Sequence, residues 1–302
     1  MTIISWIYHK DYDIPLPKNH RFTSSKFSDL FKLLSLSNIY ENCKIFSPEK
    51  VSIDELLIAH DKNYILKIKN GTLEKHEERI LGLNWSKILA NRSFLAVNGT
   101  LMTGIEALKN GVACHLGGGT HHAHYDYGSG YCVFNDLAYS SLQLINKKIV
   151  KKILIFDCDV HQGDGTASIL SKFDNIFTCS IHCKKNFPTK KSISNLDVEL
   201  NDNLNNEKYL KVLKDTLNHC ISLFKPDLVF YDAGVDIHKN DYLGKLNVNN
   251  DGLLNRDLIV INFFKKLNIP IATVIGGGYS KDNLELANRH SVIFNAADKV
   301  FN

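Results

Sequence analysis

The chain has 302 residues, a hydrophobic fraction of 44%, a charged fraction of 23% and a formal net charge of +4. These values are those of an ordinary globular protein with enough apolar residues for a sizeable core, and they argue against a disordered chain or a disulfide-held scaffold. The mild basic excess comes without a nucleic-acid-binding signature, so we expect no specific nucleic-acid partner.

Cysteine usage and hydropathy predict a cytoplasmic protein. The seven cysteines are an odd number, no pair has C-x-x-C spacing, and several lie inside apolar runs, where a free thiol behaves as a small hydrophobic group. This pattern favours a reducing compartment over a disulfide framework. Residues 1–10 are too polar for a secretory signal peptide, and no apolar run approaches the roughly 20 residues of a membrane span.

The first half of the chain is predicted to contain helices, a strand and a glycine run. The expected elements are helices at 51–69 and 85–109 and a short strand at 112–116. Gly111 is a typical C-cap for the second helix. Three glycines at 117–119 follow the strand, and the adjacent His121 and His122 come directly after them.

The second half of the chain alternates strands with helices. Apolar strands are predicted at 153–156, 177–181, 228–231 and 271–275, and helices at 206–224, 251–267 and 282–298. Alternation of this kind indicates βαβ units. We therefore predict an α/β fold with a mostly parallel central sheet flanked by helices on both faces. No repeat or linker divides the chain, so residues 1–302 are expected to form a single domain.

Polar motifs follow five of the predicted strands. They are His121 and His122, Asp157 to His161, Ser180 to His182, Asp232 with Asp236, and Gly276 to Tyr279. Sites in open parallel sheets form beyond the carboxyl ends of the strands. We therefore expect these five loops to meet in one site.

The stretch Asp157-Cys158-Asp159-Val160-His161 predicts a metal site. Side chains alternate along a strand, so Asp157, Asp159 and His161 are expected on one side. Carboxylates and an imidazole at a strand end are costly unless a cation lies between them. Oxygen and nitrogen ligands suit zinc or a neighbouring divalent metal. A solvated turn is the alternative for these residues taken alone.

A third protein ligand is available on the loop after the strand at 228–231. Asp159 and His161 together with one more aspartate would leave coordination positions open, as in a catalytic zinc site. Asp236 and Asp232 both qualify, and spacing alone does not choose between them. The alternative role for Asp236 is to cap a turn or a helix.

Five side chains are candidates for proton transfer and oxyanion binding. A neutral imidazole from His121 or His122 can act as a base, and Asp157 and Asp164 are carboxylates that could orient the pair. Tyr279 follows a glycine run and could donate a hydrogen bond to a developing oxyanion. The alternatives are a surface loop or ordinary metal ligation for the histidines, and a tyrosine packed at the rim of the sheet. Neither glycine run fits a phosphate-binding motif, and no Gly-x-Ser-x-Gly elbow is present.

These motifs resemble those of the zinc-dependent histone deacetylase family. The matching segments are GGGTHHAHYDYGSGYCVFND (117–136), IFDCDVHQGDGTA (155–167), YDAGVDIHKNDYLG (231–244) and IGGGYS (275–280). The resemblance covers nearly the whole chain, and the stretches at 8–22 and 81–86 are most similar to bacterial proteins near the class IV branch. It implies an arginase/deacetylase-like fold and zinc-dependent hydrolysis of an acyl amide, with one Zn²⁺ per chain and a structural K⁺.

The resemblance also implies roles for individual residues. The implied zinc ligands are Asp159, His161 and Asp236, which favours Asp236 over Asp232. The implied catalytic residues are His121, His122 as the general base, Asp157 and Asp164 as their orienting partners, and Tyr279. The implied potassium ligands, largely through backbone carbonyls, are Asp157, Asp159, His161, Ser180 and Ile181. The implied substrate-tunnel residues are Gly130, Tyr131, Phe187, Leu243 and Gly277, and Arg21 is expected along an internal exit channel.

The implied substrate is the acyl-lysine of a protein or peptide. The alternatives are a small acylated amine such as an acetylpolyamine, an arginase-like ureohydrolase activity, and a non-catalytic acyl-lysine-binding protein. Tyr131 replaces the phenylalanine usual in the family, which makes the tunnel more polar, and the loops are short. A basic cluster formed by Lys184, Lys185, Lys190 and Lys191 is predicted to be a solvated loop, with an anionic partner as the alternative.

Overall fold

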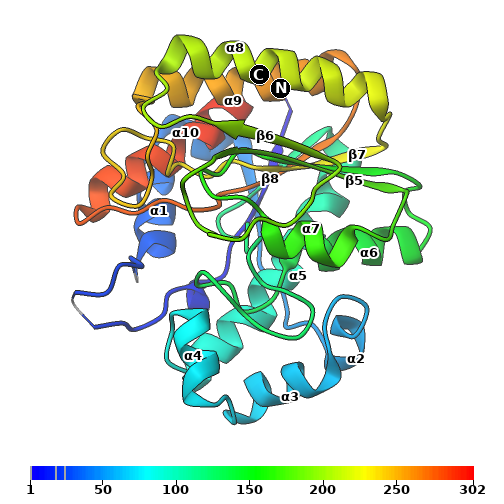
Figure 1. The fold of residues 1–302 in the computed structure, drawn as a ribbon. Coiled ribbons are helices and arrows are strands. Elements are labelled where there is room, and N and C mark those ends of the chain that lie inside the picture. The colour runs from blue at the N-terminus through cyan, green and yellow to red at the C-terminus, as the bar shows by residue number, and fades with distance from the viewer. Residues whose placement is uncertain (1, 18, 24) are drawn as a thin grey trace.

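Short apolar runs form a central sheet of eight parallel strands in the computed structural model, which describes residues 2–17, 19–23 and 25–302 (Figure 1). The strands are β1 (Ile4–Ile7), β2 (Cys43–Phe46), β3 (Val112–His115), β4 (Ile153–Asp157), β5 (Ile176–Cys183), β6 (Leu196–Leu200), β7 (Leu228–Asp232) and β8 (Ile271–Val274). Their order across the sheet is β2-β1-β3-β8-β7-β4-β5-β6. All seven neighbouring pairs are parallel, so the carboxyl ends of these strands share one edge.

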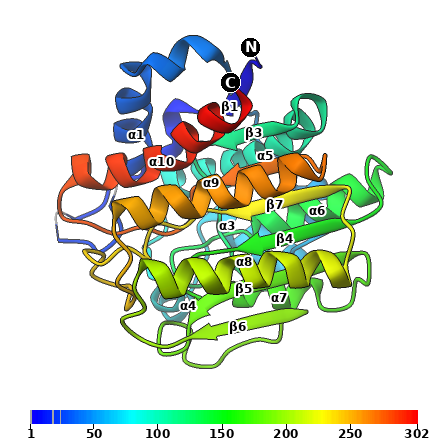
Figure 2. The same ribbon diagram turned by 90° about the horizontal axis from the view of Figure 1, so that it is seen from above.

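Helices cover both faces of the sheet, as Figures 1 and 2 show. On one face lie α1 (Lys26–Ser35), α8 (Asn206–Leu223), α9 (Asn250–Lys266) and α10 (Asn283–Phe301). On the other face lie α5 (Lys87–Asn110), α6 (Asp136–Asn146) and α7 (Asp164–Leu170). Three short helices, α2 (Ile53–Leu56), α3 (Lys62–Asn70) and α4 (Lys75–Leu81), lie beyond α5. The predicted α/β fold with a parallel sheet is therefore confirmed.

The central strands are buried along their whole length. Every residue of β3, β4, β7 and β8 is buried. Helices on both faces exclude water from both sides of these strands, which is why their sequences are continuous apolar runs and do not alternate with polar residues. The core thus fixes the strands from which the functional loops emerge.

One predicted helix is wrong in its extent. The pattern at 51–69 forms two helices, α2 and α3, separated at 57–61. The side chain of Asp61 accepts hydrogen bonds from the backbone N–H groups of Asn63 and Tyr64 and so starts α3 as an N-cap. The helix predicted at 85–109 is confirmed as α5, and its C-cap Gly111 has the left-handed φ of 82° that favours glycine.

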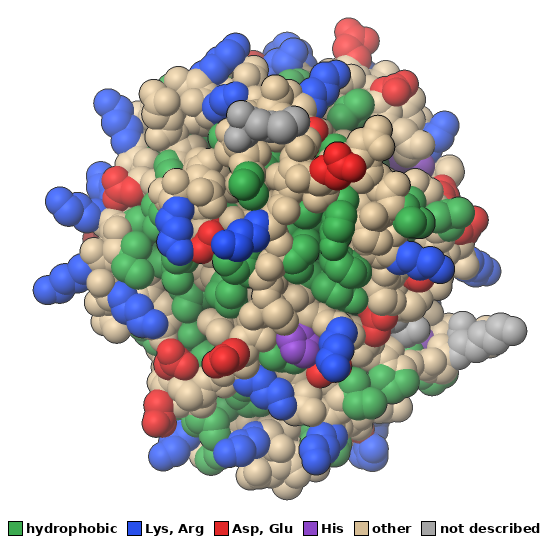
Figure 3. Space-filling model, turned by 180° about the vertical axis from the view of Figure 1, so that it is seen from behind, with side chains coloured by type: hydrophobic (Ala, Val, Ile, Leu, Met, Phe, Trp, Pro, Cys, Tyr) green, Lys and Arg blue, Asp and Glu red, His purple; other side chains and the backbone are tan. Residues whose placement is uncertain are grey.

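Charged side chains of both signs are mixed on one face of the molecule. On the face seen in Figure 3, Lys and Arg side chains lie among acidic and hydrophobic ones. The loop of the predicted basic cluster is solvated, because Lys184, Lys185 and Lys190 are exposed. Two of its charges are paired, since Lys184 lies 2.9 Å from Glu199 and Lys185 lies 3.2 Å from Asp202. No helix within the described ranges is both long and apolar enough to cross a membrane.

Candidate active site

The histidine pair lies on the loop between β3 and α6, which is tied down by polar side chains at the start of α6. The carboxylate of Asp136 accepts the backbone N–H groups of Gly119 at 3.0 Å and of Thr120 at 2.7 Å. The amide of Asn135, the N-cap of α6, donates to the carbonyl of His121. Gly119 has a φ of 78°, a conformation that glycine adopts without strain. These bonds hold the loop at the carboxyl edge of the sheet.

Asp159, His161 and Asp236 converge from the loops after β4 and β7. Each offers one ligand atom, and these atoms lie within 4.8 Å of one another. The Nδ1 atom of His161 lies 3.1 Å from Asp159 Oδ1 and 3.0 Å from Asp236 Oδ2. The carboxylates are fixed in turn, because Val160 donates its backbone N–H to Asp236 and Gly277 donates its own to Asp159. Three side chains expected as metal ligands are thus brought together.

The three donors fit a divalent cation. All three are buried, and the carboxylates require a compensating positive charge. Burial lowers the pKa of His161, but Asp159 and Asp236 outweigh it and raise the pKa to about 10. A divalent ion meets the same requirement with the oxygen and nitrogen ligands that zinc accepts. Gly234 leaves room for the Asp159 carboxylate, since a Cβ atom added at Gly234 would lie 2.3 Å from Asp159 Oδ2.

The two adjacent histidines have separate carboxylate partners. His121 Nδ1 lies 2.8 Å from Asp157 Oδ2, and His122 Nδ1 lies 2.6 Å from Asp164 Oδ1. The second oxygen of Asp164 lies 3.0 Å from Nε2 of His124. Both imidazoles are therefore oriented through Nδ1, and the pairing of each histidine with the expected aspartate is observed.

The electrostatic surroundings shift the pKa values of the two histidines in opposite directions. Burial lowers the pKa of His121, but Asp157 and Asp159 outweigh it and raise the pKa well above the usual value. Burial and the neighbouring His121 lower the pKa of His122 to about 4, against the opposing effect of Asp164. One imidazole of the pair therefore favours its charged form, and the other is neutral at pH 7. Titratable groups whose environments separate their pKa values in this way are typical of acid and base partners.

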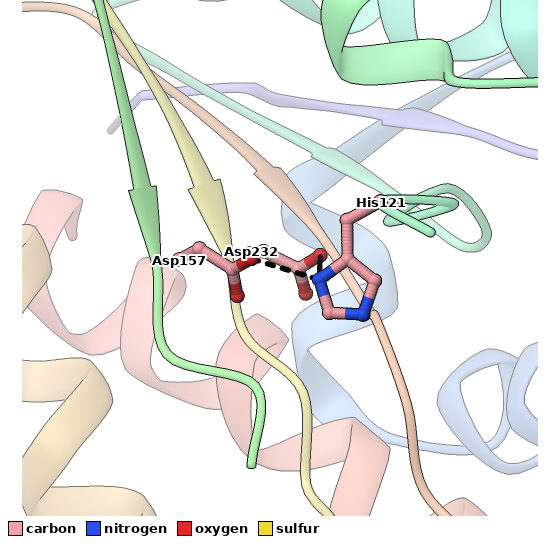
Figure 4. A group of neighbouring side chains, drawn as sticks. All are labelled: His121, Asp157 and Asp232. Atoms are coloured by element: carbon pink, nitrogen blue, oxygen red, sulfur yellow. Dashed lines mark hydrogen bonds and ion pairs between the residues drawn. The ribbon is translucent and has the colours of Figure 1, made fainter. Parts of the chain in front are cut away.

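We refer to Asp159, His161 and Asp236 as the metal-type cluster. Asp157 does not lie with these residues, contrary to the expectation from strand alternation. It forms a second buried group with His121 and Asp232, drawn in Figure 4. Asp157 is the last residue of β4, so the alternation of a strand does not continue to Asp159. Asp232 lies 3.9 Å from His121, and its Oδ2 atom has no hydrogen-bond partner among the described residues. Of the two competing aspartates, Asp236 is therefore the one that joins the metal-type cluster.

Tyr279 lies beside His161 and lines a cavity that opens to the surface. Its ring centroid is 6.4 Å from that of His161, and its backbone N–H donates to Asp241 Oδ2 at 2.6 Å. Burial, followed by the nearby charge of Asp236, raises the pKa of the phenol well above its usual value. The hydroxyl therefore keeps its proton and is able to donate a hydrogen bond.

A cavity of about 410 Å³ leads from the surface to His122, His161 and Tyr279. Four of the five residues expected in a tunnel line it, namely Gly130, Tyr131, Phe187 and Leu243. The ring of Phe187 packs edge-on against His122 with centroids 4.8 Å apart. A Cβ atom at Gly130 would lie 2.5 Å from the His122 ring, so glycine leaves that ring its place.

A second, inner cavity lies behind the cluster and measures about 30 Å³. The fifth expected tunnel residue, Gly277, lines this cavity, together with two buried cations, Lys26 and Arg92. Arg21 was expected along an internal channel, and this expectation is wrong: Arg21 is exposed and lines the outer cavity. Arg92 was missed, although a charged residue within the apolar pattern of a long helix is a signal that could have identified it.

Two of the residues expected to bind potassium, Ser180 and Ile181, lie on the strand next to Asp157. β5 pairs with β4 so that Ser180 is the register partner of Asp157, and Ile181 follows in the same strand. Both side chains are buried. The hydroxyl of Ser180 lies 3.0 Å from Nδ1 of His182.

Comparisons with known proteins agree with this geometry. A model of the histone deacetylase domain matches residues 20–293. An uncharacterized protein of Picosynechococcus sp. is 42% identical over 98% of both chains, and Histone deacetylase 2 of Arabidopsis thaliana is 29% identical over 97% of this chain and 81% of its own. The crystal structure of the HDA15 HD domain superposes with a TM-score of 0.82 at 18% identity, covering 99% of this chain and 88% of that one, which supports the fold. The chain belongs to the histone deacetylase family and is a metal-dependent amide hydrolase.

Proposed function

We propose that the chain is a deacylase that hydrolyses the acyl amide of acyl-lysine with one Zn²⁺ held by Asp159, His161 and Asp236. The observation that carries this proposal is the convergence of these three donors with His122 and Tyr279 at the inner end of a cavity open to the surface. Zinc at this position would act as a Lewis acid toward the acyl carbonyl and lower the pKa of a water molecule.

His122 is the general base in this proposal. Asp164 holds its Nδ1 atom, which leaves Nε2 as the proton acceptor. A pKa of about 4 keeps the imidazole neutral at pH 7, so the acceptor is present in the free enzyme. The attacking water gives its proton to this nitrogen.

His121 and Tyr279 complete the catalytic set. His121 is held by Asp157, and its raised pKa favours the protonated ring, which stabilises negative charge and can supply a proton to the leaving amine. The phenol of Tyr279 stays protonated and donates a hydrogen bond to the carbonyl oxygen as negative charge develops there.

The shape of the outer cavity supports a long, thin substrate side chain. The aromatic rings of Tyr131 and Phe187 line the passage to His122. Aromatic walls of this kind bind the methylene chain of a lysine through apolar contact, and the amide then reaches the cluster. An acetylpolyamine has a similar chain and is the alternative that the substrate panel below tests.

The size of the inner cavity supports a short acyl group. Its volume of about 30 Å³ is of the order of two water molecules, since a single water needs roughly 10–15 Å³ on this measure. Lys26 and Arg92 supply positive charge in this space, which suits a carboxylate product. We therefore infer that acetyl is hydrolysed faster than long acyl chains.

Four further assignments belong to the same proposal. A structural K⁺ bound by Asp157, Asp159, His161, Ser180 and Ile181 is supported by the pairing of β4 with β5 at Asp157 and Ser180. Residues 1–302 would act as one catalytic domain. Within the family, the chain would be a bacterial-type member near the class IV branch. A cytoplasmic location is supported by the seven cysteines, all of which are free thiols.

The test is a substrate panel with measured metal content. Zinc-loaded protein would be assayed on lysine peptides carrying acetyl to long-chain acyl groups and on acetylpolyamines. We expect one zinc per chain and the fastest turnover with acetyl-lysine. Zinc binding without hydrolysis of any substrate would support the non-catalytic alternative, and two catalytic ions per chain would support an arginase-like site.

A further inference from the structure

The mouth of the outer cavity carries four cationic side chains and no carboxylate among the described residues that line it. They are Arg21, Arg79, Lys185 and Lys245, and all four are exposed. We refer to these four residues as the basic mouth. The cavity that they surround leads to His122 and Tyr279, so charges on a substrate outside the tunnel would lie beside them.

The basic mouth is assembled from distant parts of the chain. Arg21 lies between β1 and α1, Arg79 in α4, Lys185 just after β5, and Lys245 on the loop after β7. A local run of lysines in a solvated loop is a common feature without a function, but convergence of four separate segments on one opening is not explained by local composition. The fold itself therefore concentrates positive charge at the entrance.

Most of this charge lacks an acidic partner. Lys185 forms an ion pair with Asp202 at 3.2 Å. Within the described residues, no carboxylate lies within 4.0 Å of the charged groups of Arg21, Arg79 or Lys245; the last donates to the carbonyl oxygen of Lys185. Among the described residues, the four cations at the entrance thus outnumber their one acidic neighbour, Asp202, which Lys185 contacts and on which the charge of Lys245 also acts.

We propose that the basic mouth selects acylated amines that carry a negatively charged group, a carboxylate or a phosphate, on the part of the substrate that remains outside the tunnel. This inference rests on the proposed function and specifies its substrate class. A cavity mouth of one sign raises the local concentration of oppositely charged ligands. A polyamine or a lysine-rich peptide tail brings like charge to the same place and is disfavoured.

The experiment compares four Nε-acetyl-lysine pentapeptides of equal length whose flanking residues are glutamate, phosphoserine, glutamine or lysine. Affinity for the zinc-loaded protein would be measured by fluorescence anisotropy and kcat/KM by amine release, each at low and high salt. We expect the glutamate peptide to exceed the lysine peptide roughly tenfold or more at low salt in both measurements, with a smaller ratio at 1 M salt, where the Debye length is about 3 Å. The glutamate and phosphoserine arms distinguish the two anionic groups.

Variants of the basic mouth test whether these residues cause the preference for the glutamate peptide. The triple variant Arg21→Gln/Arg79→Gln/Lys245→Gln is expected to reduce the glutamate-to-lysine ratio to near one. The control is Lys214→Gln on α8, an exposed lysine away from the cavity, which leaves the ratio unchanged. Equal affinities for the glutamate, glutamine and lysine peptides, or a preference for lysine, would overturn the inference. Because affinity is measured separately, absence of turnover would count against the proposed function and not against charge selection.

Discussion

The carboxylate of Asp241 accepts the backbone N–H of Tyr279 at 2.6 Å. Its other oxygen accepts the N–H groups of Leu243 at 2.9 Å and Gly244 at 3.1 Å. Asp241 follows β7 on the same loop as Asp236, whereas Tyr279 follows β8. One buried carboxylate thus fastens the loop of a proposed metal ligand to the loop of the proposed oxyanion donor.

The first prediction concerns Asp241→Asn. An amide has a single oxygen, so its NH₂ group must face one of the backbone N–H groups that the carboxylate accepts. We expect Tyr279 to lose its position, with kcat falling on the order of ten- to a hundredfold while the zinc content stays at the wild-type value. Steady-state kinetics with metal analysis measures this. The matched control is Asp215→Asn, an exposed aspartate on α8; an unchanged kcat in Asp241→Asn would refute the positioning role.

The second prediction separates chemistry from metal binding. Tyr279→Phe removes one donor aimed at the developing oxyanion, and we expect kcat to fall about 10²- to 10³-fold. His122→Ala removes the proposed base, and we expect a loss of about 10²- to 10⁴-fold. Neither side chain belongs to the metal-type cluster, so zinc stoichiometry stays unchanged. Comparable loss of zinc in these variants would contradict the roles assigned to them.

The third prediction concerns metal removal. Chelation leaves the carboxylates of Asp159 and Asp236 facing each other across His161, so we expect activity to vanish and the melting temperature to fall. Free zinc at a thousandfold excess over Kd stabilises the folded state by about 4 kcal/mol, so added zinc restores both quantities. Asp236→Ala should abolish the shift in melting temperature with zinc. His122→Ala should retain the shift, and equal loss in both variants would show that the ion binds elsewhere.

The sequence predicted five of the eight strands, all of them apolar runs that are followed by a polar motif. β4 and β7 were recognisable because strands covered on both faces are continuous apolar runs. β2 and β6 were missed, since strands at the two edges of the sheet are only partly buried. β1 was missed as well, although all four of its residues are buried, because the run Ile4–Ile7 is short and is interrupted by Ser5.

Some residues of the candidate site could be predicted from the sequence, and others could not. Residues directly after a recognisable strand, such as Asp159 and His161, could be placed at the edge of the sheet. The choice between Asp232 and Asp236 depended on the path of a loop, which spacing does not encode. Lys26 and Arg92 meet in the inner cavity from helices far apart in the chain, so only the tertiary packing brings them together.

The last prediction concerns stability in acid and rests on His60. This buried imidazole accepts the backbone N–H of Asn135 through Nε2 at 2.8 Å, and its Nδ1 faces the carbonyl oxygen of Tyr125 at 3.2 Å. Protonation at Nε2 would place a second N–H donor opposite the backbone N–H of Asn135, and this hydrogen bond would be lost. Burial lowers the pKa of His60 from 6.5 to about 4, despite the carbonyls that raise it.

Between pH 6.5 and about 4, His60 is therefore protonated in the unfolded chain and neutral in the folded one. Stability rises with pH where the unfolded state binds more protons, so the contribution of His60 is complete above pH 6.5 and is lost as the pH falls toward 4. Its size is about 3.5 kcal/mol, at roughly 1.4 kcal/mol for each pKa unit. Denaturant unfolding from pH 7.5 to 4 should show a shallower pH dependence for His60→Gln than for the wild type. His76→Gln, at an exposed histidine, should keep the wild-type slope, and an equally steep slope in His60→Gln would show that His60 does not couple folding to protons.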